Sequence, residues 1–435
     1  MRDTCFLRLN EMYNKFAFSK NKVFIFFVIS IIVRFVFVYN SGIEQISDFN
    51  SYLSLSRACL SNHLWYPNVN NLYDSYIWAP GFINYLIGLL HLFDSIKFIQ
   101  FVNVSLTVIL DLELYWLTKK YISHRTALIV LTLLCVYPTN YGISYWLISD
   151  LLFVVLFFTI LVMISWKRWY FILLAGVFTA YANWVRPFLP VLVVSAILLI
   201  MINSKSGIWK KQVVLFVATS AFTIFLIAFF TYNRMGVVNF QSSTSGINLI
   251  MGANKKATGA YMDCTIPGEV GYIENTDKVL YYVKDAIWKE RAIEYILNHP
   301  IKWISLVPNK LFYMYSNDSF AMGPFWEDHS VSLSARDIII SIRNDFPRLS
   351  LSQYIYIFNQ VVYYFVLFFS VLGLATVFKS RNKFLIMLYL YIIMGTGMTI
   401  ITVGGNRYHY ILMPAVFITA AYSLNYILNS KYKLL

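Results

Sequence analysis

Long runs of apolar residues dominate the chain, and short polar segments separate them. About ten runs approach the roughly 20 residues that a helix needs to cross the hydrocarbon core of a bilayer. They lie near residues 22–40, 98–117, 127–146, 151–166, 170–185, 188–203, 212–231, 354–378, 384–402 and 408–428. The pattern predicts an all-α polytopic membrane protein with about ten transmembrane helices.

Two further apolar stretches, residues 77–94 and 300–316, are interrupted by proline and rich in Trp or Tyr. Such segments are typical of interfacial or re-entrant helices, so we expect both to lie on the outer surface. Counting either one alone as a crossing would invert every later loop. If both cross, the number of crossings rises to twelve.

Basic residues indicate the topology. The N-terminus and the short loops that ten crossings would place in the cytoplasm hold 18 of the 35 Lys and Arg residues, and cytoplasmic loops carry such an excess. No cleavage signal follows the first apolar run, so we interpret it as an uncleaved anchor. We expect a multi-pass protein of the cell inner membrane, with both termini cytoplasmic and the active site on the periplasmic face.

Composition agrees with this class of protein. Hydrophobic residues make up 59% of the chain and charged residues only 13%, which excludes a soluble domain. The net charge of +14 is then explained by topology, and no nucleic-acid partner is expected. The 18% aromatic residues suit interfacial belts and, secondarily, stacking on sugars.

The whole chain, residues 1–435, is predicted to form a single integral-membrane domain. Two external blocks interrupt the spans, at 41–97 with amphipathic helices and at 232–353, and residues 354–435 form the last three spans. The second block mixes a Gly/Ser/Asn-rich stretch with a charged helical segment. It is expected to pack as a polar loop over the helical bundle.

Asp48 is the first candidate for chemistry. It follows Ser47, a residue that favours the N-cap position, and it opens a stretch with helical apolar spacing. The segment is interpreted as a helix lying on the membrane, with the carboxylate facing the outer ends of the spans. The alternative is that Asp48 merely caps its helix.

Asp150 is the second candidate, because it lies at the expected outer end of the fourth span, on the same membrane face as Asp48. The alternative is an acidic residue favoured by the helix dipole. Asp111 and Glu113 lie in or near a span and are interpreted as structural contacts within the bundle.

Four cations are expected on the same face. Arg186 and Arg407 start the sixth and tenth spans, Arg57 follows Asp48 by two to three turns, and Lys310 lies in the second re-entrant segment. Taken singly, each resembles a headgroup anchor. Together with two carboxylates they favour a site that binds a lipid phosphate.

A carboxylate and a phosphate clamp on an external face indicate group transfer, with the carboxylate as general base. No Gly-rich nucleotide-binding motif is present, so the activated donor is expected to arrive on a lipid carrier. Ligand spacing implies no cofactor and no metal, although two external carboxylates could hold a divalent ion weakly.

Several short motifs resemble those of membrane glycosyltransferases with the GT-C fold, in particular glycosyltransferase family 39, which includes dolichyl-phosphate-mannose protein mannosyltransferases and the lipid A aminoarabinose transferase. The motifs are Asp48 with Tyr52, WAPGF at 78–82, YPTNYGISYWLISD at 137–150, GVFTAYANWVRP at 176–187, GxNLxxGxNxxAxG at 246–259 with Asn254, HPIKWISLVPNK at 299–310, and RYH at 407–409. Their order and spacing extend along most of the chain.

The resemblance implies that Asp48 activates the acceptor and that Asp150 supports the site. It also implies a polyprenyl-phosphate sugar as donor, with Arg186, Lys310 and Arg407 as phosphate ligands. Two features depart from the family. Ala79 stands where the aminoarabinose transferase has lysine, and the first loop has a single Asp where many relatives have an Asp-Glu pair.

We therefore expect a transferase that adds one sugar to a lipid, glycan or protein acceptor at the outer face, with membrane lipids around it. Two alternatives remain: an O-antigen-type polymerase or ligase, which would lengthen chains, and a non-enzymatic polysaccharide-lipid flippase, which would tolerate loss of either carboxylate.

Overall fold

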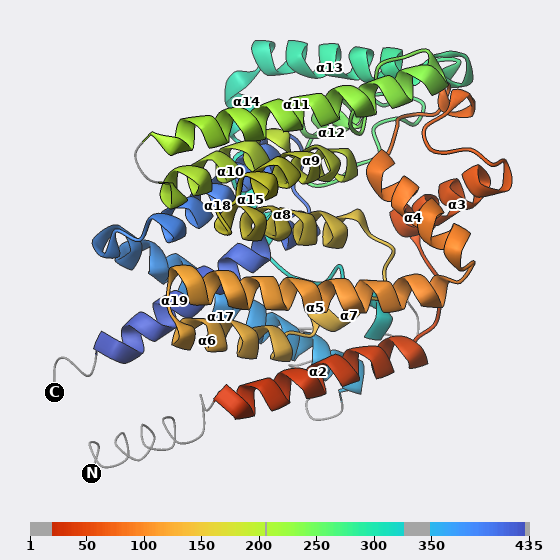
Figure 1. The fold of residues 1–435 in the computed structure, drawn as a ribbon. Coiled ribbons are helices and arrows are strands. Elements are labelled where there is room, and N and C mark those ends of the chain that lie inside the picture. Colours follow the sequence, from red (N-terminus) through yellow and green to blue (C-terminus); the bar gives the residue numbers. More distant parts are fainter. Residues whose placement is uncertain (1–19, 205–206, 326–348, 431–435) are drawn as a thin grey trace.

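The described part of the chain is built from helices and loops, without strands. The computed structural model describes residues 20–204, 207–325 and 349–430 (Figure 1). Within these ranges, six helices are long and apolar enough to cross a membrane. They are α2 (Lys20–Asn40), α5 (Ile96–Tyr121), α11 (Ile208–Met235), α17 (Leu351–Ser380), α18 (Lys383–Ile401) and α19 (Met413–Ser430), the last preceded by η4 (Tyr410–Leu412).

Five shorter apolar helices accompany them: α4 (Pro80–Leu92), α6 (His124–Val136), α8 (Ser149–Ser165), α9 (Trp169–Val185) and α10 (Leu189–Asn203). A 17-residue helix is about 25 Å long, somewhat less than the hydrocarbon core of roughly 30 Å. The chain is thus a helical membrane protein, and the count of ten crossings stays a prediction.

The remaining helices are short or polar. They are α3 (Ser47–Ser61), η1 (Val69–Asn71), α7 (Thr139–Gly142), α12 (Ser245–Gly252), η2 (Thr276–Lys278), α13 (Tyr281–Asn298), α14 (Pro300–Ile304), α15 (Val307–Tyr315) and η3 (Gly323–Phe325). The stretch 77–94 contributes only the 13 residues of α4, and 300–316 is divided between α14 and α15. Neither is among the six long helices, and their interfacial placement remains a prediction.

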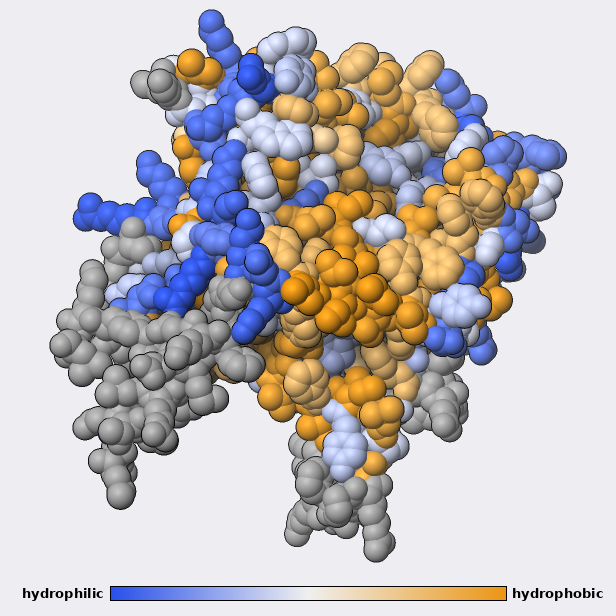
Figure 2. All heavy atoms as spheres, turned by 60° about the horizontal axis from the view of Figure 1, so that its bottom comes forward, coloured by the Kyte–Doolittle hydropathy of each residue, from blue (hydrophilic) through white to orange (hydrophobic). Residues whose placement is uncertain are grey.

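The long helices run side by side, and their connections lie at two ends of the bundle. In Figure 1 the start of α2 and the end of α19 lie at the left end, while α3 and α4 cover the right end. An even number of crossings would require the start of α2 and the end of α19 to lie on the same side of the bundle, as they do here. Figure 2 shows an apolar face between two hydrophilic regions, as expected for a bundle whose middle faces lipid.

The third predicted span, 127–146, was wrong in its extent. Helix α6 ends at Val136 and the single turn of α7 follows, so the apolar run is divided. Pro138 explains the break, because proline lacks the N–H that would continue the helix and disfavours helical backbone in the residue before it. The loop that follows α7 leads directly into α8 and Asp150.

The two blocks predicted to be external, 41–97 and 232–353, are joined in their described parts by hydrogen bonds from backbone amides. The amides of Ile77 and Ala79 donate to the hydroxyls of Ser243 and Ser242, at 2.8 and 2.7 Å. The amide of Tyr281, at the start of α13, donates to the carbonyl of Leu72 at 2.9 Å. The blocks therefore form one continuous layer at the end of the bundle where α3 and α4 lie.

Asp111 and Glu113 make polar contacts within the bundle, as the sequence predicted. Arg34 of α2 forms a buried ion pair with Asp111 of α5 at 2.7 Å, and its Nη1 also donates to Thr107. Thr159 of α8 donates to Glu113 at 2.6 Å. These contacts join neighbouring helices, and neither involves a residue of the site described below.

Candidate active site

Two loop segments bring the first turns of α3 and α8 together. The side-chain amide of Gln45 donates to the carbonyl of Tyr145 at 3.2 Å, and its oxygen accepts from the amide of Leu147 at 3.0 Å. Gln100 of α5 donates to the same carbonyl at 3.1 Å. Because these contacts precede both helices directly, they fix Asp48 and Asp150 on the same side of the bundle.

Asp150 lies in the first turn of α8 and its side chain is fully buried. Its Oδ1 accepts from Arg186 Nη1 at 2.5 Å, and its Oδ2 accepts from Arg407 Nε at 2.9 Å and Nη2 at 2.8 Å. A buried carboxylate needs such partners, because an unpaired charge would be very costly there. Both oxygens are therefore engaged by arginines.

Arg186 is the residue at which α9 ends. Its backbone is extended and Pro187 follows, so the helix cannot continue. Gly81 in the first turn of α4 packs against this end, since a Cβ there would lie 2.8 Å from the amide nitrogen of Val185. The WAPGF segment thus helps to place Arg186 beside Asp150.

Arg407 connects the two carboxylates. While its Nε and Nη2 donate to Asp150, its Nη1 donates to Asp48 Oδ2 at 2.7 Å, and the guanidinium lies 5.6 Å from the ring centroid of Phe49. Burial lowers the pKa of Arg407. The negative charges of Asp150 and Asp48 raise it by more than burial lowers it, so the net pKa is well above the ordinary value. The planar guanidinium allows this bridge between two acids.

Asp48 is the accessible acid of the cluster, because 43% of its side chain is exposed. Its hydrogen bond to Arg407 uses Oδ2, and Oδ1 has no hydrogen bond among the described residues. The predicted N-cap at Ser47 was wrong: Ser47 has φ of 49° and is the first residue of α3, whose N-cap is Ile46. Asp48 is thus held by Arg407.

Aromatic side chains surround Asp48. Tyr52, one turn later in α3, is buried. Its ring contacts the rings of Trp78 and Phe82 edge-on, with 5.4 Å between the ring centroids in each pair. Tyr76 stacks on Trp78 at 5.1 Å, and burial, then the charge of Asp48, raises the pKa of Tyr76. These rings form an aromatic cluster next to the first turn of α3, which carries Asp48.

The sequence did not identify Tyr76 or Tyr408 as aromatic residues of the site. The guanidinium of Arg186 lies 5.7 Å from the ring centroid of Tyr408. Tyr408 directly follows Arg407 in the RYH motif, which is the signal that could have pointed to it. Tyr76 has no such signal, since it lies in an irregular loop among several other aromatic residues.

Three predicted site residues have their contacts elsewhere. Arg57 is exposed and its nearest acid is the exposed Asp94, at 3.9 Å. Asn254 is buried and donates to the carbonyl of Ile250 at 2.7 Å, which stabilises the turn after α12. Lys310 is buried and donates to the carbonyl of Ile400 at 3.0 Å. The structure therefore brings together Asp48, Tyr52, Asp150, Arg186 and Arg407.

Lys310 nevertheless lies under the segment that carries Arg407. A Cβ at Gly404 would lie 2.3 Å from the Lys310 carbonyl oxygen, so this glycine permits close packing of the two segments. The Lys310 ammonium lies 5.3 Å from the ring centroid of Trp303, and burial lowers its pKa to about 8. Its position favours support of the 402–409 segment.

A cavity of about 370 Å³ lies between α4, α9 and α11. Its lining is almost entirely apolar and consists of Trp65, Asn84, Trp184, Thr223, Leu226, Ile227 and Phe230. Trp184 is two residues before Arg186, so the cavity lies at the same end of α9 as the charged cluster.

Among the described residues, no three His, Cys, Asp or Glu side chains are grouped as a metal site.

Comparison with solved structures found chains of similar fold. The apo oligosaccharyltransferase of Archaeoglobus fulgidus aligns over 95% of this chain and 51% of its own length, with a TM-score of 0.51 and 12% identity. The archaeal oligosaccharyltransferase of that organism in complex with an inhibitory peptide and a dolichol-phosphate aligns over 96% and 51%, with a TM-score of 0.50 and 13% identity. The chain thus spans about half the length of these neighbours.

At this low identity the likeness shows the fold. The chain has the helical membrane architecture of a GT-C-like protein, which confirms the expected fold at this level. No model of a protein family matches the chain, and no curated protein matches it either.

Proposed function

We propose that this protein transfers a sugar from a lipid-phosphate carrier to an acceptor at the outer face of the membrane. The observation that carries the proposal is the half-exposed carboxylate of Asp48. One of its oxygens is fixed by Arg407 and the other is open, at the end of the bundle covered by the external layer. The GT-C-like fold supports the same class of reaction.

Asp48 acts as general base in this proposal. It accepts the proton of an acceptor hydroxyl as that oxygen forms a bond to the anomeric carbon of the sugar. The bond between this carbon and the phosphate oxygen breaks, and the electron pair leaves with the lipid phosphate. Arg407 orients Asp48 through its hydrogen bond to Oδ2, so the base is in place before the acceptor binds.

Asp150 then has a positioning role. Because both of its oxygens accept from arginines, it holds Arg186 and Arg407 at a fixed separation. Among the described residues, the hydrogen bonds of the Arg186 guanidinium use Nη1 alone, which leaves the N–H groups of Nε and Nη2 for an incoming phosphate oxygen. Developing negative charge on the leaving phosphate would be stabilised there.

A lipid carrier suits the surroundings of this site. The apolar cavity beside α9 offers space for part of a prenyl chain close to Arg186. One structural neighbour was solved with a dolichol-phosphate and an inhibitory peptide, which supports a polyprenyl-phosphate donor. The acceptor is a glycan, a lipid or a protein, and the proposed location is the inner membrane, with the site facing the periplasm and both termini in the cytoplasm.

A deletion strain tests this function. Mass spectrometry of its cell-surface glycans and lipids should show the loss of one sugar residue, which the wild-type chain restores and Asp48→Asn does not. Asp94→Asn, at an exposed acid of the same external block, should restore it fully and serves as the control. Unchanged glycans and lipids would contradict the proposal, while the loss of long polymers would favour a polymerase.

A further inference from the structure

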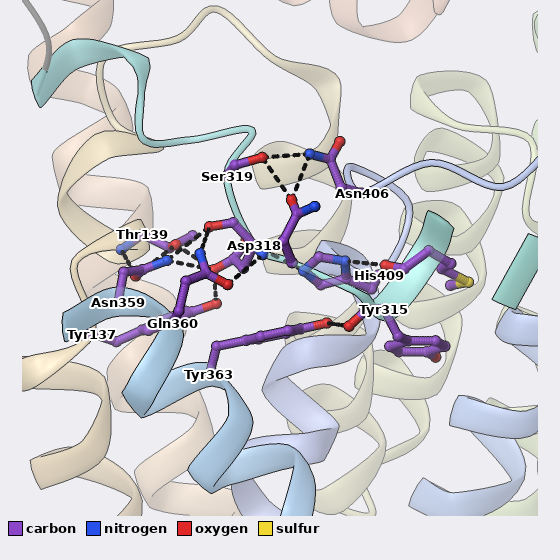
Figure 3. Close-up of polar contacts among 12 residues, drawn as sticks. Tyr137, Thr139, Tyr315, Asp318, Ser319, Asn359, Gln360, Tyr363, Asn406 and His409 are labelled. Atoms are coloured by element: carbon purple, nitrogen blue, oxygen red, sulfur yellow. Dashed lines mark hydrogen bonds and ion pairs between the residues drawn. The ribbon is translucent and has the colours of Figure 1, made fainter. Parts of the chain in front are cut away.

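A second buried charged cluster lies close to the segment that carries Arg407, and the proposed chemistry does not use it. Asp318 lies between α15 and η3, and His409 lies two residues after Arg407. Both side chains are fully buried, and His409 Nε2 lies 3.3 Å from Asp318 Oδ1 (Figure 3). Removing one partner of such a buried pair strongly destabilises a protein.

Asp318 is held from several elements at once. Its Oδ2 accepts from the hydroxyls of Tyr137 and Thr139, the latter at 2.5 Å, and from the amide of Asn359 in α17 at 3.2 Å. Gln360 of α17 donates to its carbonyl at 2.9 Å and accepts from its amide at 3.1 Å. The carboxylate is therefore a fixed point between α6, α7 and α17.

The orientation of the His409 ring is equally determined. Nδ1 lies 2.7 Å from the carbonyl oxygen of Met314, and because a carbonyl only accepts, Nδ1 carries a proton. The ring lies beside Tyr363 and Tyr315, with centroids 5.0 and 6.0 Å away. Its Nε2 is then directed to Asp318 alone.

The charge state of Asp318 follows from its hydrogen bonds. Three donors converge on Asp318 Oδ2, so this oxygen acts only as an acceptor. Burial raises the pKa of Asp318, but the hydrogen bond and charge of His409 and the two hydroxyls lower it more, so the net pKa is below the ordinary value. The ionised Oδ1 of Asp318 can only accept, so it receives the hydrogen bond of His409 Nε2.

The residue before Arg407 is tied to the same segment. Asn406 donates to the hydroxyl of Ser319 at 2.6 Å and to the side-chain oxygen of Asn317 at 3.1 Å. Residues 317–319 therefore hold the chain on both sides of Arg407, at 406 and at 409. The backbone of Arg407 has little freedom to move its guanidinium away from the two acids.

We propose that Asp318 and His409 are positioning residues, which lock the 406–409 segment so that Arg407 bridges Asp48 and Asp150. The pair touches no reacting atom in the proposed reaction. Its effect on sugar transfer rests on the proposed function, whereas its effect on the position of Arg407 does not.

The test measures Arg407 directly. Purified protein in detergent is treated with a dione reagent that modifies guanidinium groups, and mass spectrometry follows the peptide containing Arg407. In the wild type, Arg407 is protected by its bonds to two acids and by burial. Asp318→Ala should raise its modification rate on the order of tenfold, about 1.4 kcal/mol of lost restraint. The exposed Arg57 should react equally in every variant.

Two further variants separate positioning from a general loss of stability. In Asp318→Asn the amide oxygen accepts from the hydroxyls and the amide nitrogen donates to a neutral His409, so protection should largely return. Asp111→Asn alters an equally buried ion pair far along the chain from this segment and should leave Arg407 protected. If Asp318→Ala is poorly folded, His409→Gln is measured in its place.

An unchanged Arg407 modification rate in folded Asp318→Ala, or an equal rise in Asp111→Asn, would overturn the proposal. Transfer assays on the same samples distinguish the two hypotheses. Deprotection of Arg407 in a protein whose wild type transfers no sugar would retain the positioning role and reject the proposed function.

Discussion

At the scale of single residues, the site is a chain of charges in which each group orients the next. Asp150 holds Arg407, and Arg407 holds Asp48, whose second oxygen is open to an acceptor. Two acids and two arginines give the cluster no net charge, and their mutual attraction and hydrogen bonds offset the cost of taking each charge out of water. The exposed end of this chain is the acid proposed as the base.

Lysine substitutions should separate the two arginines. Arg407 uses three nitrogens for two acids, and a lysine cannot span both, so Arg407→Lys should lower the rate of sugar transfer on the order of 10²-fold. Arg186 uses one nitrogen for Asp150, and a lysine ammonium can keep that ion pair while a second N–H faces the phosphate, so Arg186→Lys should stay within about tenfold of the wild type. Initial rates on matched folded protein decide this, and equal losses would contradict the bridging role of Arg407.

Lys310 should make stability depend on pH. Its folded-state pKa is about 8, while an unfolded lysine keeps its proton to about pH 10.4. Between these values the unfolded chain binds more protons, so the contribution of Lys310 to stability should rise with pH across this window. Lys310→Met lacks the titration.

Melting temperatures in detergent at pH 7 to 10 measure this difference. Relative to Lys310→Met, the wild type should become more stable above about pH 8 and show a constant offset below it. Parallel melting curves for the two proteins over the whole range would show that Lys310 does not lose its proton on folding.

At the scale of elements, loops and helix ends build the site while the apolar helices support it. Asp48 and Asp150 lie in first turns, Arg186 ends α9, and Arg407 lies between α18 and η4. Helix ends suit this role because their positions are fixed by packing while their side chains reach the polar layer. The contact of α4 with α9 is one such fixed point.

Glycines of α4 test that contact. A methyl group at Gly81 would meet the backbone of Trp184 and Val185 at under 3 Å, whereas nothing lies within 4 Å of the corresponding position at Gly88. Gly81→Ala should therefore destabilise the protein by about 1–3 kcal/mol and displace Arg186. Gly88→Ala should be neutral or stabilising by about 0.5–1 kcal/mol. Similar melting temperatures for both variants would contradict close packing at Gly81.

At the scale of the whole molecule, the apolar runs predicted where most helices lie, because each lipid-facing helix needs a continuous apolar stretch. The pattern of apolar runs could not predict that Asp48 pairs with Arg407. The two residues are 359 positions apart and are brought together by loop contacts such as those of Gln45. Lys310 shows the same limit, because residue order does not say that its side chain turns inward. The sequence nevertheless predicted that Asp48, Asp150, Arg186 and Arg407 share one membrane face, and the structure places the four side chains together.

Cysteine labelling tests the topology of the molecule. In a cysteine-free background, single cysteines at Asn70 and Asn275 should react with a membrane-impermeant maleimide in intact cells. Cysteines at Lys119 and Lys210 should react only after the membrane is permeabilised, because basic loops face the cytoplasm. Labelling of all four positions from one side would exclude the proposed arrangement.

The most direct test of the account is the transfer rate of Asp48→Asn. Purified protein in lipid vesicles receives a polyprenyl-phosphate sugar and the acceptor identified from the deletion strain, and Asp94→Asn is the matched control. Removing a general base should slow transfer by about 10² to 10⁴-fold while Asp94→Asn keeps the wild-type rate. Transfer by folded Asp48→Asn at the wild-type rate would contradict the central claim.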